Sequence, residues 1–160
     1  MSNKMTAKEY LGQAYRLDQR INSKIEQVSS LHTLATKATS TISDMPGSCT
    51  RNTHRMEDIL VKIIDLENEI NADIDLLVTL KKEVPLVIDS VGNMDERMVL
   101  RYRYVHNFTW SKIGEELNAD ERTVRRWHNR ALAHITIPEN CTVVSNVPEM
   151  SVDVHMGRVL

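Results

Sequence analysis

The sequence is poor in aromatic residues, with one Phe, two Trp and four Tyr among 160 residues. This composition favours thin layers of packed helices over a thick aromatic core. There are only two cysteines, Cys49 and Cys141, and they lie far apart with neither CxxC spacing nor a neighbouring histidine pair. That arrangement argues against a zinc site and a disulfide framework. We therefore expect an all-α protein with free thiols, no metal and no cofactor.

Long apolar runs and catalytic motifs are also missing from the chain. No stretch approaches the ~20 apolar residues that a membrane-spanning helix needs, and the polar start MSNKMTAKEY lacks the apolar core of a signal peptide. The patterns GxxxxGK, HExxH and GxSxG do not occur. We therefore expect a cytoplasmic protein that does not associate with membranes and is not an enzyme.

The chain has no excess of positive charge, since its formal net charge is -2 and its pI is about 6.3. Taken as a whole, this argues against nucleic-acid binding, because phosphate contacts need positive potential. The charge is unevenly distributed, however. Between Arg122 and Arg130 there are four arginines and no acidic residue. This segment is therefore a candidate DNA-binding surface.

Two long segments, about residues 6–42 and 56–84, show the three- and four-residue spacing of amphipathic helices. A turn rich in Pro, Gly, Ser and Asn at residues 43–52 separates them. Residues 4–40 hold six basic and three acidic side chains, whereas residues 55–83 hold four and eight, so the two helices attract each other. We predict a long, coiled-coil-like antiparallel hairpin that also self-associates. Its core stripes are Leu11, Ala14, Leu17, Ile21, Ile25, Val28, Leu31, Ala35 and Ala38, and Met56, Ile59, Ile63, Leu66, Ile70, Ile74, Leu77, Leu80 and Val84.

Pro85 is expected to end or kink the second long helix, because proline lacks the helical N–H and disfavours helix at the residue before it. We place a domain boundary there. The hairpin then occupies residues 1–84, and a compact module of four short helices occupies residues 85–135. The tail, residues 136–160, has scattered valines and two prolines, which is typical of a flexible segment or of weak strands.

Residues 109–135 match the pattern of a helix-turn-helix, in which two short helices pack at a steep angle. Counted from Trp110, the core positions of this motif are all apolar, and a small residue stands where the helices approach most closely. Asn118 tolerates the left-handed backbone that the turn requires. Thr109 and Asp120 are placed to be N-caps of the two helices. The expected core residues are Ile113, Gly114, Leu117, Ala119, Val124 and Trp127.

The second helix of this motif would turn a basic face to the solvent if Val124 and Trp127 face the core. Arginine suits DNA recognition because its guanidinium forms paired hydrogen bonds with guanine or phosphate. We predict that this helix reads the major groove. Lys112 and Arg130 would lie nearer the phosphates. The expected DNA contacts are Arg122, Thr123, Arg125, Arg126, Asn129, Arg130 and Lys112.

The other polar residues of this segment suggest neither a metal site nor a catalytic site. His128 and His134 have no Cys or carboxylate at ligand spacing, which argues against a metal site. The adjacent acidic pairs 115–116 and 120–121 point apart on a helix. We expect no catalytic residues here.

The string DERMVLRYRYVHNFTWSKIGEELNADERTVRRWHNRALAHI resembles region four of bacterial sigma factors, the module that reads the −35 promoter element and touches the polymerase flap. Residues 5–135 as a whole resemble a family of sigma-factor-like proteins from phages and prophages of Firmicutes. The resemblance implies a transcriptional regulator of phage genes in the cytoplasm of a bacterial host. It departs from complete sigma factors, since no aromatic-rich strand-melting region precedes the module.

The favoured function is sequence-specific binding of double-stranded DNA, with RNA polymerase and a second copy of the chain as further candidate partners. An alternative is a DNA-packaging protein similar to phage small terminase subunits, which also join a helix-turn-helix to oligomerising helices. A purely structural coiled-coil adaptor is a more remote alternative. Ring assemblies would favour packaging, whereas a monomer or dimer would favour regulation.

Overall fold

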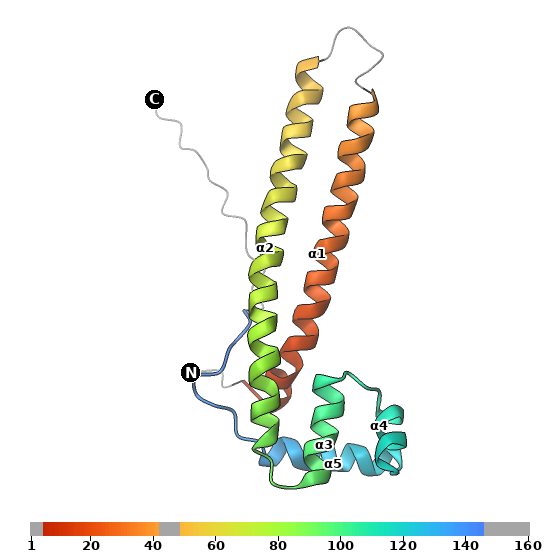
Figure 1. The fold of residues 1–160 in the computed structure, drawn as a ribbon, viewed down its shortest axis with the longest axis vertical. Coiled ribbons are helices and arrows are strands. Elements are labelled where there is room, and N and C mark those ends of the chain that lie inside the picture. The colour runs from red at the N-terminus through yellow and green to blue at the C-terminus, as the bar shows by residue number, and fades with distance from the viewer. Residues whose placement is uncertain (1–4, 42–48, 146–160) are drawn as a thin grey trace.

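A computed structural model describes residues 5–41 and 49–145, and the elements in this part of the chain are all helical (Figure 1). The predictions of an all-α fold and of a long helical hairpin followed by a compact helical module are confirmed. No helix in the described residues is long and apolar enough to cross a membrane. The helices are α1 (Ala7–Thr41), α2 (Cys49–Asp89), α3 (Met94–Leu100), the π-helix η1 (Arg101–Val105), α4 (Trp110–Leu117) and α5 (Glu121–His134).

Helices α1 and α2 pack side by side along most of their length and form the hairpin. Residues 42–48 of the predicted turn lie outside the described residues, and α2 begins at Cys49, earlier than the turn prediction allowed. The buried residues follow the predicted spacing in the half nearest the C-terminal module. They are Ala14, Leu17, Ile21, Ile70, Leu77 and Leu80.

One layer of the hairpin differs from the prediction. Ile25 and Ile74, both expected in the core, are 48% and 40% exposed. The core position is held instead by Asp73, which is buried. Its carboxylate accepts hydrogen bonds from Arg20 Nε at 3.1 Å, Arg20 Nη2 at 2.6 Å and Lys24 Nζ at 2.9 Å. A paired charged layer therefore crosses the hairpin where apolar packing was expected.

The expectation that Pro85 ends α2 is wrong, because the helix continues to Asp89. Proline inside a helix costs about 3 kcal/mol through its missing N–H and its ring clash. Burial on both sides of Pro85 offsets that cost, since Val84, Val87 and Ile88 are all buried. The first of the four short helices expected after Pro85 is thus the end of α2.

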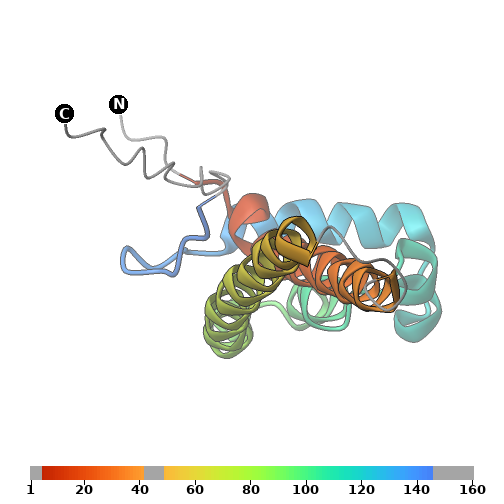
Figure 2. The same cartoon turned by 90° about the horizontal axis from the view of Figure 1, so that it is seen from above.

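The C-terminal module packs against the end of the hairpin, with α5 lying across it (Figures 1 and 2). One core joins the two parts: Tyr10 and Leu11 of α1 meet Val84 and Ile88 of α2, and Ala131 of α5 belongs to the same cluster. The hairpin and the module therefore share buried side chains across the boundary proposed at Pro85. No separate linker connects them in the described residues.

The described part of the tail, residues 136–145, contains neither helix nor strand and lies against the hairpin. The Thr142 hydroxyl donates to Glu83 Oε1 at 2.6 Å, and its N–H donates to Glu83 Oε2 at 3.1 Å. Gln13 bonds to the backbone of Thr142 and Val144. These contacts fasten the chain after α5 to both helices of the hairpin.

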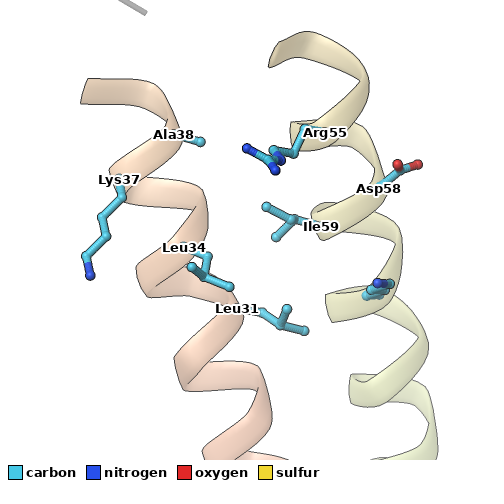
Figure 3. Close-up of a pocket in the computed structure, with 8 residues that line it drawn as sticks. Leu31, Leu34, Lys37, Ala38, Arg55, Asp58 and Ile59 are labelled. Carbon is cyan, nitrogen blue, oxygen red and sulfur yellow. The ribbon is translucent and has the colours of Figure 1, made fainter. Parts of the chain in front are cut away.

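The far half of the hairpin is packed less closely. An open groove of about 630 Å³ lies between α1 and α2, with Leu31 and Leu34 facing Ile59 across it (Figure 3). Leu34 is 50% exposed. The groove lies at the end of the hairpin farthest from the C-terminal module.

Candidate nucleic-acid interface

Aromatic side chains at the start of the module hold α4 in place. The Tyr102 and Phe108 rings stack with centroids 5.5 Å apart, and both pack on a cluster of Val99, Ile113 and Val124. All three aliphatic residues of that cluster are fully buried. Helix α3, which carries Val99, is capped at its N-terminus by Asn93, whose side chain accepts hydrogen bonds from the N–H groups of residues 95 and 96. The cluster fixes α3, α4 and α5 against one another.

The turn between α4 and α5 depends on two residues. A side chain added at Gly114 would place its Cβ 2.7 Å from the Ala119 carbonyl oxygen, so only glycine fits between the helices there. Asn118 has φ 50° and ψ 43°, the left-handed conformation in which asparagine is among the tolerated residues. The chain therefore reverses in the short space between Leu117 and Glu121.

The N-termini of the two helices differ in their capping. The Thr109 hydroxyl accepts a hydrogen bond from the Lys112 N–H at 3.3 Å, as an N-cap does. Asp120 has the extended backbone of an N-cap, and its carboxylate interacts with the hydroxyl and the backbone of Thr123, which lowers the pKa of Asp120. Helix α5 ends in a basic last turn at His134.

The structure brings the six predicted helix-turn-helix core residues together. Ile113, Gly114 and Val124 are buried. Leu117, Ala119 and Trp127 are partly buried and pack on the same cluster. The buried polar residue of α5 is His128, which the sequence reasoning did not place in the core.

The predicted DNA contacts lie on the outer side of this unit. Arg122, Arg126, Asn129 and Arg130 are exposed on α5, whereas Thr123 is half-buried. The side chains of Arg122, Arg126 and Arg130 form no hydrogen bond or ion pair with the described residues. The outer side of α5 therefore presents three guanidinium groups without an ion pair to a described residue, and the Asp120 carboxylate lies near enough to Arg126 for their charges to interact.

Two of the predicted contacts are held by neighbours within the module. Arg125 donates to Glu121 Oε1 at 2.6 Å, one helical turn away. Lys112 forms an ion pair with Glu116 at 3.0 Å. Hydrogen bonding to Glu116 is the main cause that raises the pKa of Lys112. These two cations are less available to a phosphate than the three unpaired arginines.

The Trp110 ring is flanked by two arginines. The Arg103 guanidinium lies 4.4 Å from the ring centroid and that of Arg125 lies 5.1 Å away. Arg103 also donates to the Phe108 carbonyl oxygen at 2.9 Å. Stacking on an aromatic face and pairing with Glu121 together orient Arg125 before any ligand binds.

The family model described as "Protein of unknown function (DUF1492)" matches residues 37–136, more than half of the chain. The chain belongs to this family. The DUF1492 match begins in the last turns of α1 and extends past the end of α5, so it contains the whole candidate interface. No curated protein and no solved structure matches the chain.

His128 is a buried member of the DUF1492 segment. Its Nε2 lies 2.8 Å from the Tyr104 hydroxyl, and its ring meets the edge of Trp110 at 4.8 Å. Burial is the main cause that lowers its pKa to about 4, and the positive charges of Lys8 and Arg103 act in the same direction. The imidazole is therefore neutral at physiological pH and serves the core.

Acid should destabilise the protein through His128. The folded pKa of about 4 lies below the ordinary value of 6.5. Between these two pH values the imidazole therefore binds a proton in the unfolded chain but not in the folded chain. The stabilisation is complete above pH 6.5 and is lost as the pH falls toward 4, by up to about 3 kcal/mol. We expect His128→Gln, which cannot titrate, to lack this component in urea unfolding measured across that range. Parallel pH dependences in the two proteins would contradict the assignment.

In the described part of the chain, no three His, Cys, Asp or Glu side chains gather in a way that could hold a metal ion. His134 Nδ1 pairs with buried Glu96 at 2.8 Å. Cys141 is a partly buried free thiol. The side chain of Cys49 lies outside the described residues.

Proposed function

We propose that the protein is a non-enzymatic, sequence-specific DNA-binding regulator of transcription in which α5 enters the major groove. The observation that carries this proposal is the row of unpaired arginines on the second helix of a tightly packed helix-turn-helix. An α-helix fits the major groove, and arginine pairs with guanine O6 and N7 or with phosphate. The overall charge of -2 does not oppose this, because α2 holds nine acidic and five basic residues, whereas residues 94–135 hold six acidic and eight basic ones.

The geometry suggests different tasks for the individual side chains. Arg122, Arg126 and Asn129 follow one another at steps of four and three residues, so they share one side of α5 and are proposed to face the base edges. Arg125 is proposed to act beside them from its fixed position on Trp110. Arg130 and Lys112 are proposed to contact phosphates, and Thr123 to support the first turn.

The resemblance to sigma region four supports a second part of the proposal, contact with RNA polymerase at phage or prophage promoters in a bacterial host. DNA binding beside the polymerase is the role that fits, since the hairpin takes the place of a strand-melting region. Footprinting on the host genome separates regulation from DNA packaging. A recurrent site upstream of an operon supports regulation, and its absence favours packaging.

We expect Arg126→Ala to weaken binding to a site selected from random DNA by ~1–3 kcal/mol, while binding to unrelated DNA changes little. Replacing a phosphate contact, as in Arg130→Ala, should instead weaken binding to the selected site and to unrelated DNA alike. It should also reduce the slope of log affinity against log salt concentration by about one unit. Arg55→Ala, at the far end of the hairpin, is the matched control and should bind normally. Wild-type affinity of the double variant R125A/R126A at physiological salt would refute recognition by α5.

A further inference from the structure

One flank of α2, about 100° around the helix from the residues that face α1, carries a row of side chains that neither α1 nor the module covers. Four of them are aliphatic and between 40% and 56% exposed. Polar residues at the same three- and four-residue steps complete the row, so all lie along one side of the helix. We call this row the outer stripe. It consists of Glu57, Leu60, Ile64, Glu67, Asn71, Ile74, Val78 and Lys81.

The outer stripe is symmetric about position 69. Residues equally distant from that position are matched in chemistry, aliphatic with aliphatic, polar with polar and acidic with basic. A helix that reads the same from both ends in this way is complementary to an antiparallel copy of itself. The matched pairs are Glu57 with Lys81, Leu60 with Val78, Ile64 with Ile74 and Glu67 with Asn71.

We propose that the outer stripe is the interface of a homodimer in which two α2 helices pack antiparallel about a two-fold axis at position 69. A two-fold interface uses the same patch on both copies, so every matched pair occurs twice. Leu60 of one copy then packs on Val78 of the other, and Ile64 packs on Ile74. The acidic and basic ends meet as two ion pairs. The symmetric row thus identifies the occupant as a second copy of this chain.

The polar centre of the stripe fits this arrangement. Glu67 of one copy lies beside Asn71 of the other, where the amide can donate to the carboxylate. Polar residues inside a helix interface cost stability but fix its register and orientation. Sliding α2 by one turn would set these residues against aliphatic ones. The row therefore specifies one alignment of the two helices.

The described residues around the stripe leave it accessible. The tail segment binds Gln13, Arg20 and Glu83, none of which belongs to the stripe. The groove between the helices is lined by Leu34, Arg55 and Lys62, likewise outside it. The stripe extends over 25 helical residues, from 57 to 81, and its 24 steps of 1.5 Å give a length of roughly 36 Å.

Sedimentation equilibrium of the full chain across a dilution series tests the proposal, with circular dichroism to check helicity. We expect a reversible dimer for the wild type. Ile64→Glu should raise the dissociation constant roughly 100-fold or more, because it buries an unpaired charge twice. Leu34→Glu, a matched charge on the groove, should leave it unchanged. A monomeric wild type, or dissociation by the groove variant and not by the stripe variant, would overturn the proposal.

Charge exchange tests the antiparallel alignment. Glu57→Lys and Lys81→Glu should each raise the dissociation constant, by roughly 10-fold for two exposed pairs. The double variant E57K/K81E restores opposite charges across the interface and should return close to the wild-type value. Failure of this rescue would rule out the alignment. None of these residues lies on α5, so the outcome is separate from the test of DNA binding.

Discussion

Replacing Gly114 by valine is expected to destabilise the C-terminal module severely. The new Cβ would lie 2.7 Å from the Ala119 carbonyl oxygen. That obstacle is backbone, fixed by the left-handed Asn118 and by the start of α5, so it cannot move aside as a flexible side chain could. We expect a loss at or above the top of the ~1–3 kcal/mol range for overpacking. Urea unfolding followed by Trp fluorescence would measure it, because Trp110 and Trp127 both pack in this module.

Gly12→Val is the matched control for that change. Gly12 also lies within a helix, but a Cβ there meets only the flexible Arg16 guanidinium, at 3.9 Å. Valine is slightly better than glycine in a helix, so the control should be neutral or stabilising by a few tenths of a kcal/mol. Equal effects of the two substitutions would mean that α4 and α5 do not approach at Gly114.

Removal of the Asp73 carboxylate is expected to loosen the hairpin. In Asp73→Ala, Arg20 and Lys24 lose their shared partner while their side chains remain only 34% and 19% exposed. Lys24 keeps its ion pair with Glu69 at 2.9 Å. Breaking a buried pair from one side typically costs 3–5 kcal/mol, and the partial exposure of Arg20 favours a value of about 3 kcal/mol. Thermal unfolding would measure the loss. Asp75→Ala, an exposed neighbour on α2, should change stability by less than about 0.5 kcal/mol.

The same layer gives a second acid-sensitive step. Burial of Asp73 favours a raised pKa, but hydrogen bonds from Arg20 and Lys24 outweigh it and hold the pKa below the ordinary value of 3.8. A lowered carboxyl pKa stabilises the fold above 3.8 and ceases to do so as the pH falls through the folded value. Asp73→Ala should lack this step below pH 3.8, whereas the His128 step lies between 6.5 and 4.

Much of the fold follows from local sequence rules. The spacing of apolar residues predicts the hairpin, and the turn chemistry of Gly114 and Asn118 predicts the α4–α5 reversal, because both depend on neighbours within a few residues. The shift from Ile25 and Ile74 to Lys24 and Asp73 is different. Steps of three and four both continue a helical stripe, so only the partner helix determines which side faces inward. A buried charged residue such as Asp73 can therefore be predicted only when the positions of its cationic partners on the other helix are known.

The remaining differences concern tertiary contacts. Helix α2 continues through Pro85 because the residues around it are buried against α1 and α5. This burial outweighs the local tendency of proline to end a helix. His128 enters the core since Tyr104, distant in sequence, offers a hydrogen bond. The tail lacks periodicity, and its position depends on side chains of Gln13 and Glu83 more than fifty residues away. The arginine face was predictable, but the engagement of Arg125 by Trp110 was not.

The charged layer limits how the chain can change in length. One residue inserted into α2 between Asp73 and Val84 would rotate everything on one side of it by about 100°, since a helix has 3.6 residues per turn. Asp73 would then turn away from Arg20 and Lys24, or the last turns of α2 would leave the core that holds α5. Insertions of seven residues, matched in α1, nearly conserve both alignments. Length variation compatible with this fold is therefore expected in paired heptads or outside the two long helices.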